Sequence, residues 1–153
     1  METTKENLDL ERLRSMIEGG IPYLKNMGIK VLNLKPFKVK LQLPHNPQNL
    51  NYIGTCHAGA IFTFGETCGG ALIGASFDLS KYFLVVKSAY VEYLKPIKDL
   101  ISCETGISEQ EHKRVVEEIE RKGKSLLTIS LSLLNEGGED AARLELTYVL
   151  KKR

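Results

Sequence analysis

The stretch from residue 51 to residue 67 combines a helix start with a carboxylate, and together these two features suit an attack on a carbonyl group. A polar loop that contains Gly54 runs directly into an apolar segment that the sequence predicts to be helical. The start of a helix presents unpaired backbone N–H groups and a partial positive charge, which stabilise a developing oxyanion. Glu66 stands about two turns into this helix, among apolar residues, where a carboxylate is costly unless it is paired or functional.

The spacing of the two features predicts how the site is assembled. Ala58 and Glu66 are eight residues apart, which corresponds to about 12 Å along a helix and roughly 80° around it. One carbonyl group cannot contact both residues. If both act in one reaction, they must come from two subunits whose helices run antiparallel across a two-fold axis. We therefore expect an obligate homodimer, with further assembly into a homotetramer left open.

The helix that carries the site is expected over residues 56–76, and it is unusual because it contains five glycines. Each glycine costs roughly 0.8–1 kcal/mol relative to alanine in an exposed helix. Packing must compensate, and glycines allow another backbone to approach closely. We therefore place this helix against a sheet and against a symmetry mate.

The residues before the site predict one helix and one strand. Apolar residues recur at helical spacing, at Leu8, Leu10, Leu13, Met16 and Ile17. Gly19 and Gly20 end the pattern. A short helical turn is expected over residues 22–27, and one strand over residues 29–43. We divide the chain into an N-terminal helical segment, residues 1–27, and a main body, residues 28–153, within a single domain.

The residues after the site predict mostly strands. Residues 82–94 and 100–107 are expected to be strands, and residues 108–122 a surface helix; residues 126–134 and 142–150 should form a hairpin around residues 135–138. In the first of these strands we expect Val86, Ser88, Tyr90 and Glu92 to share one face. This order of elements predicts an α+β domain in which one antiparallel sheet packs on a central helix.

Composition limits the classes of partner and compartment. The chain has 153 residues, of which 42% are hydrophobic and 26% charged, and a net charge of +2, so charge indicates neither a nucleic acid nor a membrane as partner. The first residues lack the apolar core of a signal peptide. Cys56, Cys68 and Cys103 are scattered, which fits a reducing cytoplasm and no zinc site. The sequence also lacks a phosphate-binding glycine loop.

Four features together resemble the hotdog-fold acyl-CoA thioesterases: Asn51, the glycine-bearing loop 54–59, the helix with Glu66, and the strand end at residues 93–96. The nearest branch is that of the phenylacetate-pathway-type thioesterases and their bacterial relatives. Ala58 replaces the first glycine of that family's turn, but its backbone N–H is kept. The resemblance implies an antiparallel sheet wrapped around a long helix, active sites at a dimer interface, and coenzyme A as part of the substrate, with no further cofactor.

The resemblance also implies roles for single residues. The N–H groups of Ala58 and Gly59 would hold the thioester oxygen, and Glu66 of the other subunit would attack directly or activate water. Asn51 would position that water, and His57 would orient the carbonyl group or brace the loop. We assign substrate binding to four further residues, Phe62, Lys87, Ser88 and Tyr90.

Each role has a structural alternative. Glu66 could pair with Lys87, His57 could cap the helix, and Asn51 could be an ordinary turn residue. Cys56 near a helix start has a lowered thiol pKa, but we disfavour it as a nucleophile because His57 is adjacent in sequence and cannot easily act as its base. At the level of function, the alternatives are a non-catalytic acyl-binding module and a hotdog dehydratase. The acyl chain and the choice between coenzyme A and acyl carrier protein stay open.

Overall fold

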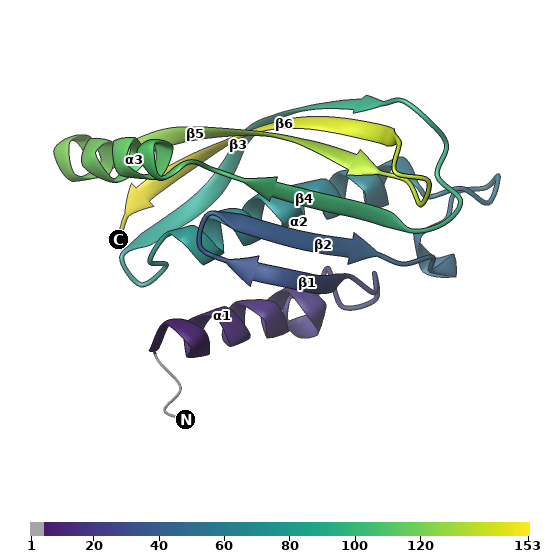
Figure 1. Ribbon diagram of the computed structural model, residues 1–153, viewed down its shortest axis with the longest axis horizontal. Helices are drawn as coiled ribbons and strands as arrows, with labels where there is room; N and C mark the ends of the chain where they lie inside the picture. Colours follow the sequence, from purple (N-terminus) through teal and green to yellow (C-terminus); the bar gives the residue numbers. More distant parts are fainter. Residues whose placement is uncertain (1–4) are drawn as a thin grey trace.

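The computed structural model describes residues 5–153, apart from the side chains of Lys5 and Leu8, and it shows one curved antiparallel sheet packed on a long helix (Figure 1). The six strands are arranged in the order β1-β2-β4-β5-β6-β3. Their bounds are β1 Lys30–Lys35, β2 Lys38–Leu43, β3 Tyr82–Tyr93, β4 Ile101–Gly106, β5 Lys124–Leu134 and β6 Asp140–Lys152. The helices are α1 Lys5–Ser15, α2 Ala58–Ser76 and α3 Glu109–Lys122, with short helical turns at Met16–Gly20 and Pro47–Asn49. The α+β hotdog prediction is confirmed.

The long helix α2 lies on one face of the sheet, and two of its glycines make this contact possible. A Cβ atom on Gly65 would lie 2.6 Å from Cδ2 of Leu144, and one on Gly69 would lie 2.4 Å from the hydroxyl oxygen of Tyr148. Both partners are buried residues of β6. The absence of side chains at these two positions therefore brings the helix close to the strand, and burial of the surrounding apolar side chains offsets the low helix propensity of glycine.

The single strand expected over residues 29–43 is wrong, because the chain reverses at Pro36 and Phe37 to form the hairpin β1–β2. Phe37 has a φ of 69°, a left-handed conformation that is uncommon outside glycine, asparagine and aspartate. Tertiary contacts hold it there: its N–H donates to Oγ of Ser76 at 3.0 Å, and its carbonyl accepts from the N–H of Ile107 at 3.1 Å. Local sequence carries no sign of these contacts.

Strand β3 forms one edge of the sheet. The expectation that Val86, Ser88, Tyr90 and Glu92 share one face is wrong at Val86. The register shifts between Val86 and Ser88, which leaves Lys87 in a bulge. Val86 pairs with Tyr148 and therefore faces α2, whereas Ser88 and Tyr90 pair with Thr147 and Glu145 on the outer face. A bulge adds one residue to a strand and so reverses the alternation after it, which simple period-two counting cannot detect.

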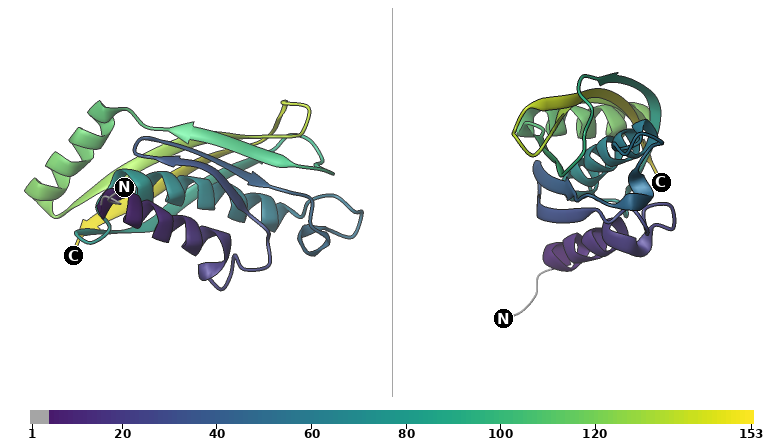
Figure 2. Two further views of the ribbon diagram at one scale, coloured as in Figure 1. Left: turned by 60° about the horizontal axis from the view of Figure 1, so that its bottom comes forward. Right: turned by 90° about the vertical axis from the view of Figure 1, so that its right-hand side faces the viewer.

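Strand β1 forms the other edge, and the N-terminal region covers it (Figure 2). The N–H of Val31 donates to Oε1 of Glu18 at 2.8 Å, and the carbonyl of the same residue accepts a hydrogen bond from Arg14. Side chains thus take the place of a neighbouring strand at this position. The proposed boundary at residues 27 and 28 stays a prediction, although α1 contacts both α2 and β1.

The C-terminal half follows the sequence prediction closely. Ser108 caps α3 by accepting a hydrogen bond from the N–H of Glu111, and Gly123 ends the helix with a φ of 80°. Val115 and Ile119 are the buried residues of this helix. The hairpin β5–β6 is confirmed, and β4 meets β5 at a single residue pair, Ser102 and Leu134, before the two strands diverge towards α3. Within residues 5–153, no helix has both the length and the apolar character needed to cross a membrane.

Candidate functional site

The start of α2 is held by hydrogen bonds to three separate segments. The N–H of Cys56 donates to the carbonyl of Ile97, and the N–H of His57 donates to the carbonyl of Asn49, each at 2.7 Å. The hydroxyl of Tyr93, at the end of β3, donates to the carbonyl of Ala58 at 3.1 Å. These contacts fix the direction of the first helical N–H groups.

His57 is the N-cap of α2, which agrees with the bracing role considered from the sequence. Its Nδ1 accepts a hydrogen bond from the N–H of Gly59 at 2.8 Å, so Nδ1 carries no proton and a neutral ring bears its proton on Nε2. The N–H of Gly59 is therefore engaged. The N–H of Ala58 takes part in none of the hydrogen bonds among residues 5–153, and Ala58 is exposed. Of the two predicted oxyanion donors, Ala58 is the one that is free.

Asn51 is committed to its own loop. Its Oδ1 accepts from the N–H groups of Ile53 and Thr55 at 3.1 Å each, and its Nδ2 donates to Oγ1 of Thr55 at 2.8 Å. This is the turn role weighed from the sequence. One N–H of the carboxamide is left over, because an amide carries two donors. The catalytic role of Asn51 stays a prediction that would use this second N–H.

Glu66 is half-buried on α2, and its carboxylate has no partner. None of the hydrogen bonds or ion pairs among residues 5–153 involves the side chain, so the alternative ion pair with Lys87 does not form. Burial without compensating contacts raises the pKa of Glu66 above its ordinary value. The backbone carbonyl of the same residue accepts a hydrogen bond from Tyr148 at 2.9 Å. A carboxylate in this state is suited to accept a proton or to attack an electrophile.

A cavity of about 370 Å³ opens beside the first two turns of α2. Its wall includes His57, Gly59 and Thr63 from the helix side, and Tyr23 and Met27 from the segment that follows the N-terminal helix. Among residues 5–153, no three His, Cys, Asp or Glu side chains gather closely enough to hold a metal ion. The site as described therefore consists of protein donors and one carboxylate.

The sequence-based expectation for the pKa of the Cys56 thiol is wrong in direction. Burial raises the pKa of the Cys56 thiol to about 11, whereas position at a helix start predicted a lowered value. Desolvation of the thiolate outweighs the partial charge of the helix here. Cys56 is therefore a protonated thiol at neutral pH, which agrees with the view that it is not the nucleophile.

The four residues assigned to substrate binding are not brought together within one protomer. Phe62 is half-buried on α2, one turn before Glu66. Ser88 and Tyr90 lie on the outer face of the sheet, away from α2, and Lys87 lies in the bulge between the two faces. All three residues of β3 are exposed. Their roles stay predictions that depend on a second subunit.

The sequence did not indicate that two tyrosines hold α2 in place through hydrogen bonds to its backbone carbonyls. Tyr93 was noted only as part of a strand end, and Tyr148 only as part of a predicted strand. The buried alternation in β6 could have placed Tyr148 on the inner face, but its pairing with Gly69 depends on a tertiary register that local sequence does not show. Because α2 is one continuous helix, Ala58 and Glu66 remain about 12 Å apart along it.

Comparisons with known proteins agree with this fold. A family described as a domain of unknown function, DUF4442, matches residues 11–150. A protein of unknown function from Pseudomonas aeruginosa, named a probable thioesterase, is 31% identical and has a TM-score of 0.87, with 94% of this chain and 95% of that chain covered. No curated protein matches the chain.

Two more distant structures show the same fold. A protein of unknown function from Chlorobaculum tepidum is 16% identical, with a TM-score of 0.83 and coverage of 99% of this chain and 98% of that chain. A variant of a thioesterase from Pseudomonas aeruginosa is 15% identical, with a TM-score of 0.73 and coverage of 99% and 100%. The chain therefore belongs to the DUF4442 family and is a hotdog-fold protein of the thioesterase type.

Proposed function

We propose that this protein hydrolyses acyl thioesters of coenzyme A. The observation that carries the proposal is the unpaired, half-buried Glu66, whose pKa is raised by burial, on the same helix whose first N–H, that of Ala58, has no partner. An oxyanion donor and a carboxylate are the two groups that this hydrolysis requires. The thioesterase type of the chain supports the reaction class.

The chemistry follows from these two groups. The N–H of Ala58 donates to the thioester oxygen and stabilises the negative charge that develops there. Glu66 either removes a proton from water, which then adds to the carbonyl carbon, or adds to that carbon itself and forms an anhydride that water opens. In both routes the carbon–sulfur bond breaks, and the thiol leaves with a proton. The second N–H of Asn51 would hold the water molecule.

The shared site requires a dimer, and β3 supplies an edge on which one can form. This strand is 12 residues long, and among residues 5–153 its only sheet neighbour is β6. Apolar side chains are exposed on both of its faces: Val85 and Tyr90 outside at 52% and 66%, and Tyr93 inside at 50%. A long, apolar, unpaired edge strand favours pairing with another chain. Antiparallel pairing of two β3 strands would continue the sheet and place two α2 helices side by side in opposite directions.

The reaction is tested by release of free thiol from acyl-CoA thioesters of several chain lengths. Wild-type protein should release thiol, and Glu66→Gln should lower turnover by orders of magnitude without unfolding, because a group needed only in the transition state is lost. Glu145→Gln, on the exposed outer face of β6, is the matched control and should keep wild-type turnover. Turnover of Glu66→Gln equal to that of wild type would refute the assignment and favour the acyl-binding module.

A further inference from the structure

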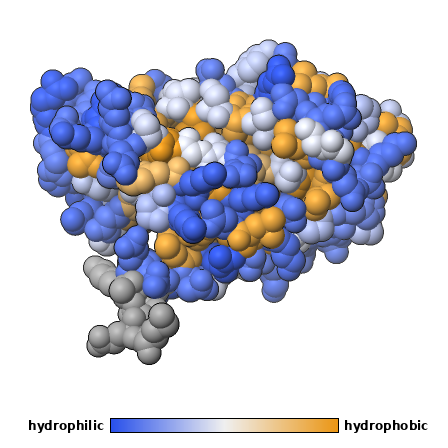
Figure 3. Space-filling view, viewed as in Figure 1, coloured by the Kyte–Doolittle hydropathy of each residue, from blue (hydrophilic) through white to orange (hydrophobic). Residues whose placement is uncertain are grey.

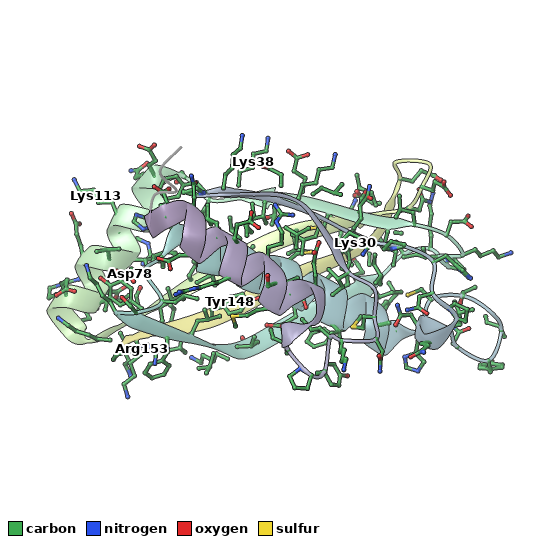
Figure 4. All side chains as sticks on the ribbon, turned by 90° about the horizontal axis from the view of Figure 1, so that it is seen from below. Lys30, Lys38, Asp78, Lys113, Tyr148 and Arg153 are labelled. Atoms are coloured by element: carbon green, nitrogen blue, oxygen red, sulfur yellow. The ribbon has the colours of Figure 1, made fainter. Side chains whose placement is uncertain are left out.

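The end of strand β3 meets the start of α2 at a hydrogen bond that has no part in the proposed reaction so far. The hydroxyl of Tyr93 donates to the carbonyl of Ala58 at 3.1 Å. Tyr93 is 50% exposed, and Ala58 is exposed. Figure 4, seen from below, shows α1 crossing the other end of α2 and leaving this start uncovered. The contact therefore lies at the surface of a single protomer, beside the candidate site.

The bulge in β3 turns Tyr93 towards the helix. Val86 before the bulge pairs with Tyr148, and Tyr93 after it pairs with Ala142; both partners are buried. An odd number of positions separates Val86 from Tyr93, and strict alternation would place two such residues on opposite faces. The extra residue at Lys87 reverses the alternation and brings Tyr93 to the face of α2. Bulges next to active sites commonly re-aim a side chain in this way.

The carbonyl that Tyr93 binds belongs to the peptide unit that joins Ala58 and Gly59. The N–H of the same unit donates to Nδ1 of His57 at 2.8 Å. The unit is therefore held at both of its polar ends, by the strand at its oxygen and by the helix cap at its nitrogen. A planar peptide unit that is bound at both ends has little freedom to rotate. This restricts the neighbouring unit, which carries the N–H of Ala58 that is free among residues 5–153.

The two hydrogen bonds of this peptide unit also strengthen each other. Donation to a carbonyl oxygen polarises the peptide and makes its N–H a better donor. Tyr93 therefore strengthens the bond from Gly59 to Nδ1 of His57, and this bond keeps the proton of the neutral ring on Nε2. His57 lines the cavity of about 370 Å³ beside α2. A hydroxyl on the strand thus influences both polar groups of the helix start, the His57 ring and the N–H of Ala58.

A purely structural role accounts poorly for this contact. Figure 3 shows hydrophobic side chains at the surface near the end of the molecule where β3 ends and α2 begins. A hydrogen bond that is open to water adds little to stability, because water competes for both groups. Each segment also has backbone bonds of its own: the N–H of Leu94 donates to the carbonyl of Ala141 at 2.9 Å, and the N–H of His57 donates to that of Asn49 at 2.7 Å. Neither segment depends on Tyr93 to stay in place.

We propose that Tyr93 is a positioning residue of the candidate site. Its hydroxyl holds the peptide between Ala58 and Gly59 so that the N–H of Gly59 stays on His57 and the N–H of Ala58 points at the thioester oxygen. This inference rests on the proposed hydrolysis at Glu66. Tyr93 acts through the backbone of α2 rather than on the substrate. Because the oxyanion contact is strongest in the transition state, its misplacement lowers kcat more than it raises KM.

Steady-state kinetics of Tyr93→Phe on acyl-CoA thioesters test the effect on catalysis. The kcat value should fall about tenfold, and KM should stay within about twofold of wild type. Tyr82→Phe is the matched control, because it removes a hydroxyl that contacts Glu120 from the other end of the same strand. This control should keep the wild-type kcat. Equal kcat in Tyr93→Phe and wild type, or an equal loss in Tyr82→Phe, would overturn the inference.

A spectroscopic measurement separates this inference from the proposed reaction. In Tyr93→Phe, heteronuclear NMR should show a shifted amide resonance for Gly59 and an exchange of its proton with solvent that is about tenfold faster. Tyr82→Phe should leave both unchanged. If Gly59 responds in this way but wild-type protein cleaves no thioester, the proposed function fails and the positioning contact stands. If thioesters are cleaved but Gly59 does not respond, the inference about Tyr93 alone fails.

Discussion

The hydroxyl of Tyr148 donates a 2.9 Å hydrogen bond to the backbone carbonyl of Glu66, so strand β6 holds the helical turn from which the unpaired carboxylate projects. The position opposite this contact is Gly69, where a Cβ atom would lie 2.4 Å from the hydroxyl oxygen. The position of the Glu66 carboxylate therefore depends on the contact of Tyr148 with α2. A substitution at Tyr148 should change that position indirectly.

Replacement of Tyr148 by phenylalanine tests whether this hydrogen bond positions Glu66. The variant loses one buried hydrogen bond, and the free energy of unfolding should fall by about 0.5–1.5 kcal/mol. Because Glu66 becomes less precisely placed, kcat should fall more than KM changes. Urea denaturation and steady-state kinetics measure the two effects. Tyr82→Phe, which loses a hydroxyl contact with Glu120, is the control; an equal loss of kcat in that variant would show that the contact with Glu66 has no special role.

Two neighbouring glycines of α2 should respond in opposite ways to alanine. Gly69→Ala forces a methyl group against Tyr148 and should lower the free energy of unfolding by about 1–3 kcal/mol. Gly70→Ala enters open space and gains helix propensity, so it should be neutral or stabilising by up to about 1 kcal/mol. Thermal or urea unfolding of both variants under one condition measures the difference. A destabilised Gly70→Ala would indicate that a second subunit covers this position.

The raised pKa of Glu66 predicts a pH-dependent effect on stability. Burial raises the folded-state value above the ordinary 4.5, so the ionised carboxylate costs stability at neutral pH. This cost is absent below pH 4.5 and develops as the pH rises through the raised folded-state value. Glu66→Gln should therefore unfold at a higher Tm than wild type at pH 7, with no such advantage at pH 4. A variant that is less stable than wild type at pH 7 would contradict the assignment of an uncompensated charge.

The division of each site between two chains is tested by mixing inactive variants. Glu66→Gln removes the carboxylate, and Ala58→Pro removes the N–H while proline remains acceptable in the first helical turn. After joint unfolding and refolding, random pairing makes half of the dimers mixed, and each mixed dimer has one site with both defects and one with neither. Activity should therefore recover to about a quarter of wild type. Native mass spectrometry must confirm the mixed dimers. Continued inactivity in their presence would mean that Glu66 acts within its own chain or not at all.

The sequence predicted the parts of the fold that depend on local pattern. The glycine-rich helix, the hairpin around residues 135–138 and the surface helix over residues 108–122 were expected from apolar spacing and turn residues, and the structure contains all three. It did not predict the reversal at Phe37, since contacts with Ser76 and Ile107 hold that conformation from distant parts of the chain. The bulge at Lys87 was missed for a related reason, because it is a property of the pairing with β6.

For the site, the sequence indicated candidate residues but neither their hydrogen bonds nor their pKa values. The sequence indicated Glu66 and the N–H of Ala58, yet the engagement of the Gly59 N–H by His57 depends on a rotamer of the cap. The raised pKa of Cys56 likewise depends on burial by neighbouring segments, which outweighs the local effect of the helix start. Desolvation is a tertiary quantity, and a motif alone does not determine it.

Arg14 donates a hydrogen bond to the carbonyl of Val31, and the N–H of Val31 donates to Glu18, so side chains cover the edge strand β1 at this residue. These two bonds occupy one residue of β1 at one border, whereas β3 at the opposite border has no second strand beside it among residues 5–153. If two chains pair through β3, the combined sheet ends in a β1 strand at each border. Such pairing would leave no free β3 strand, so the apolar edge that could otherwise propagate a fibre would stop growth at a pair.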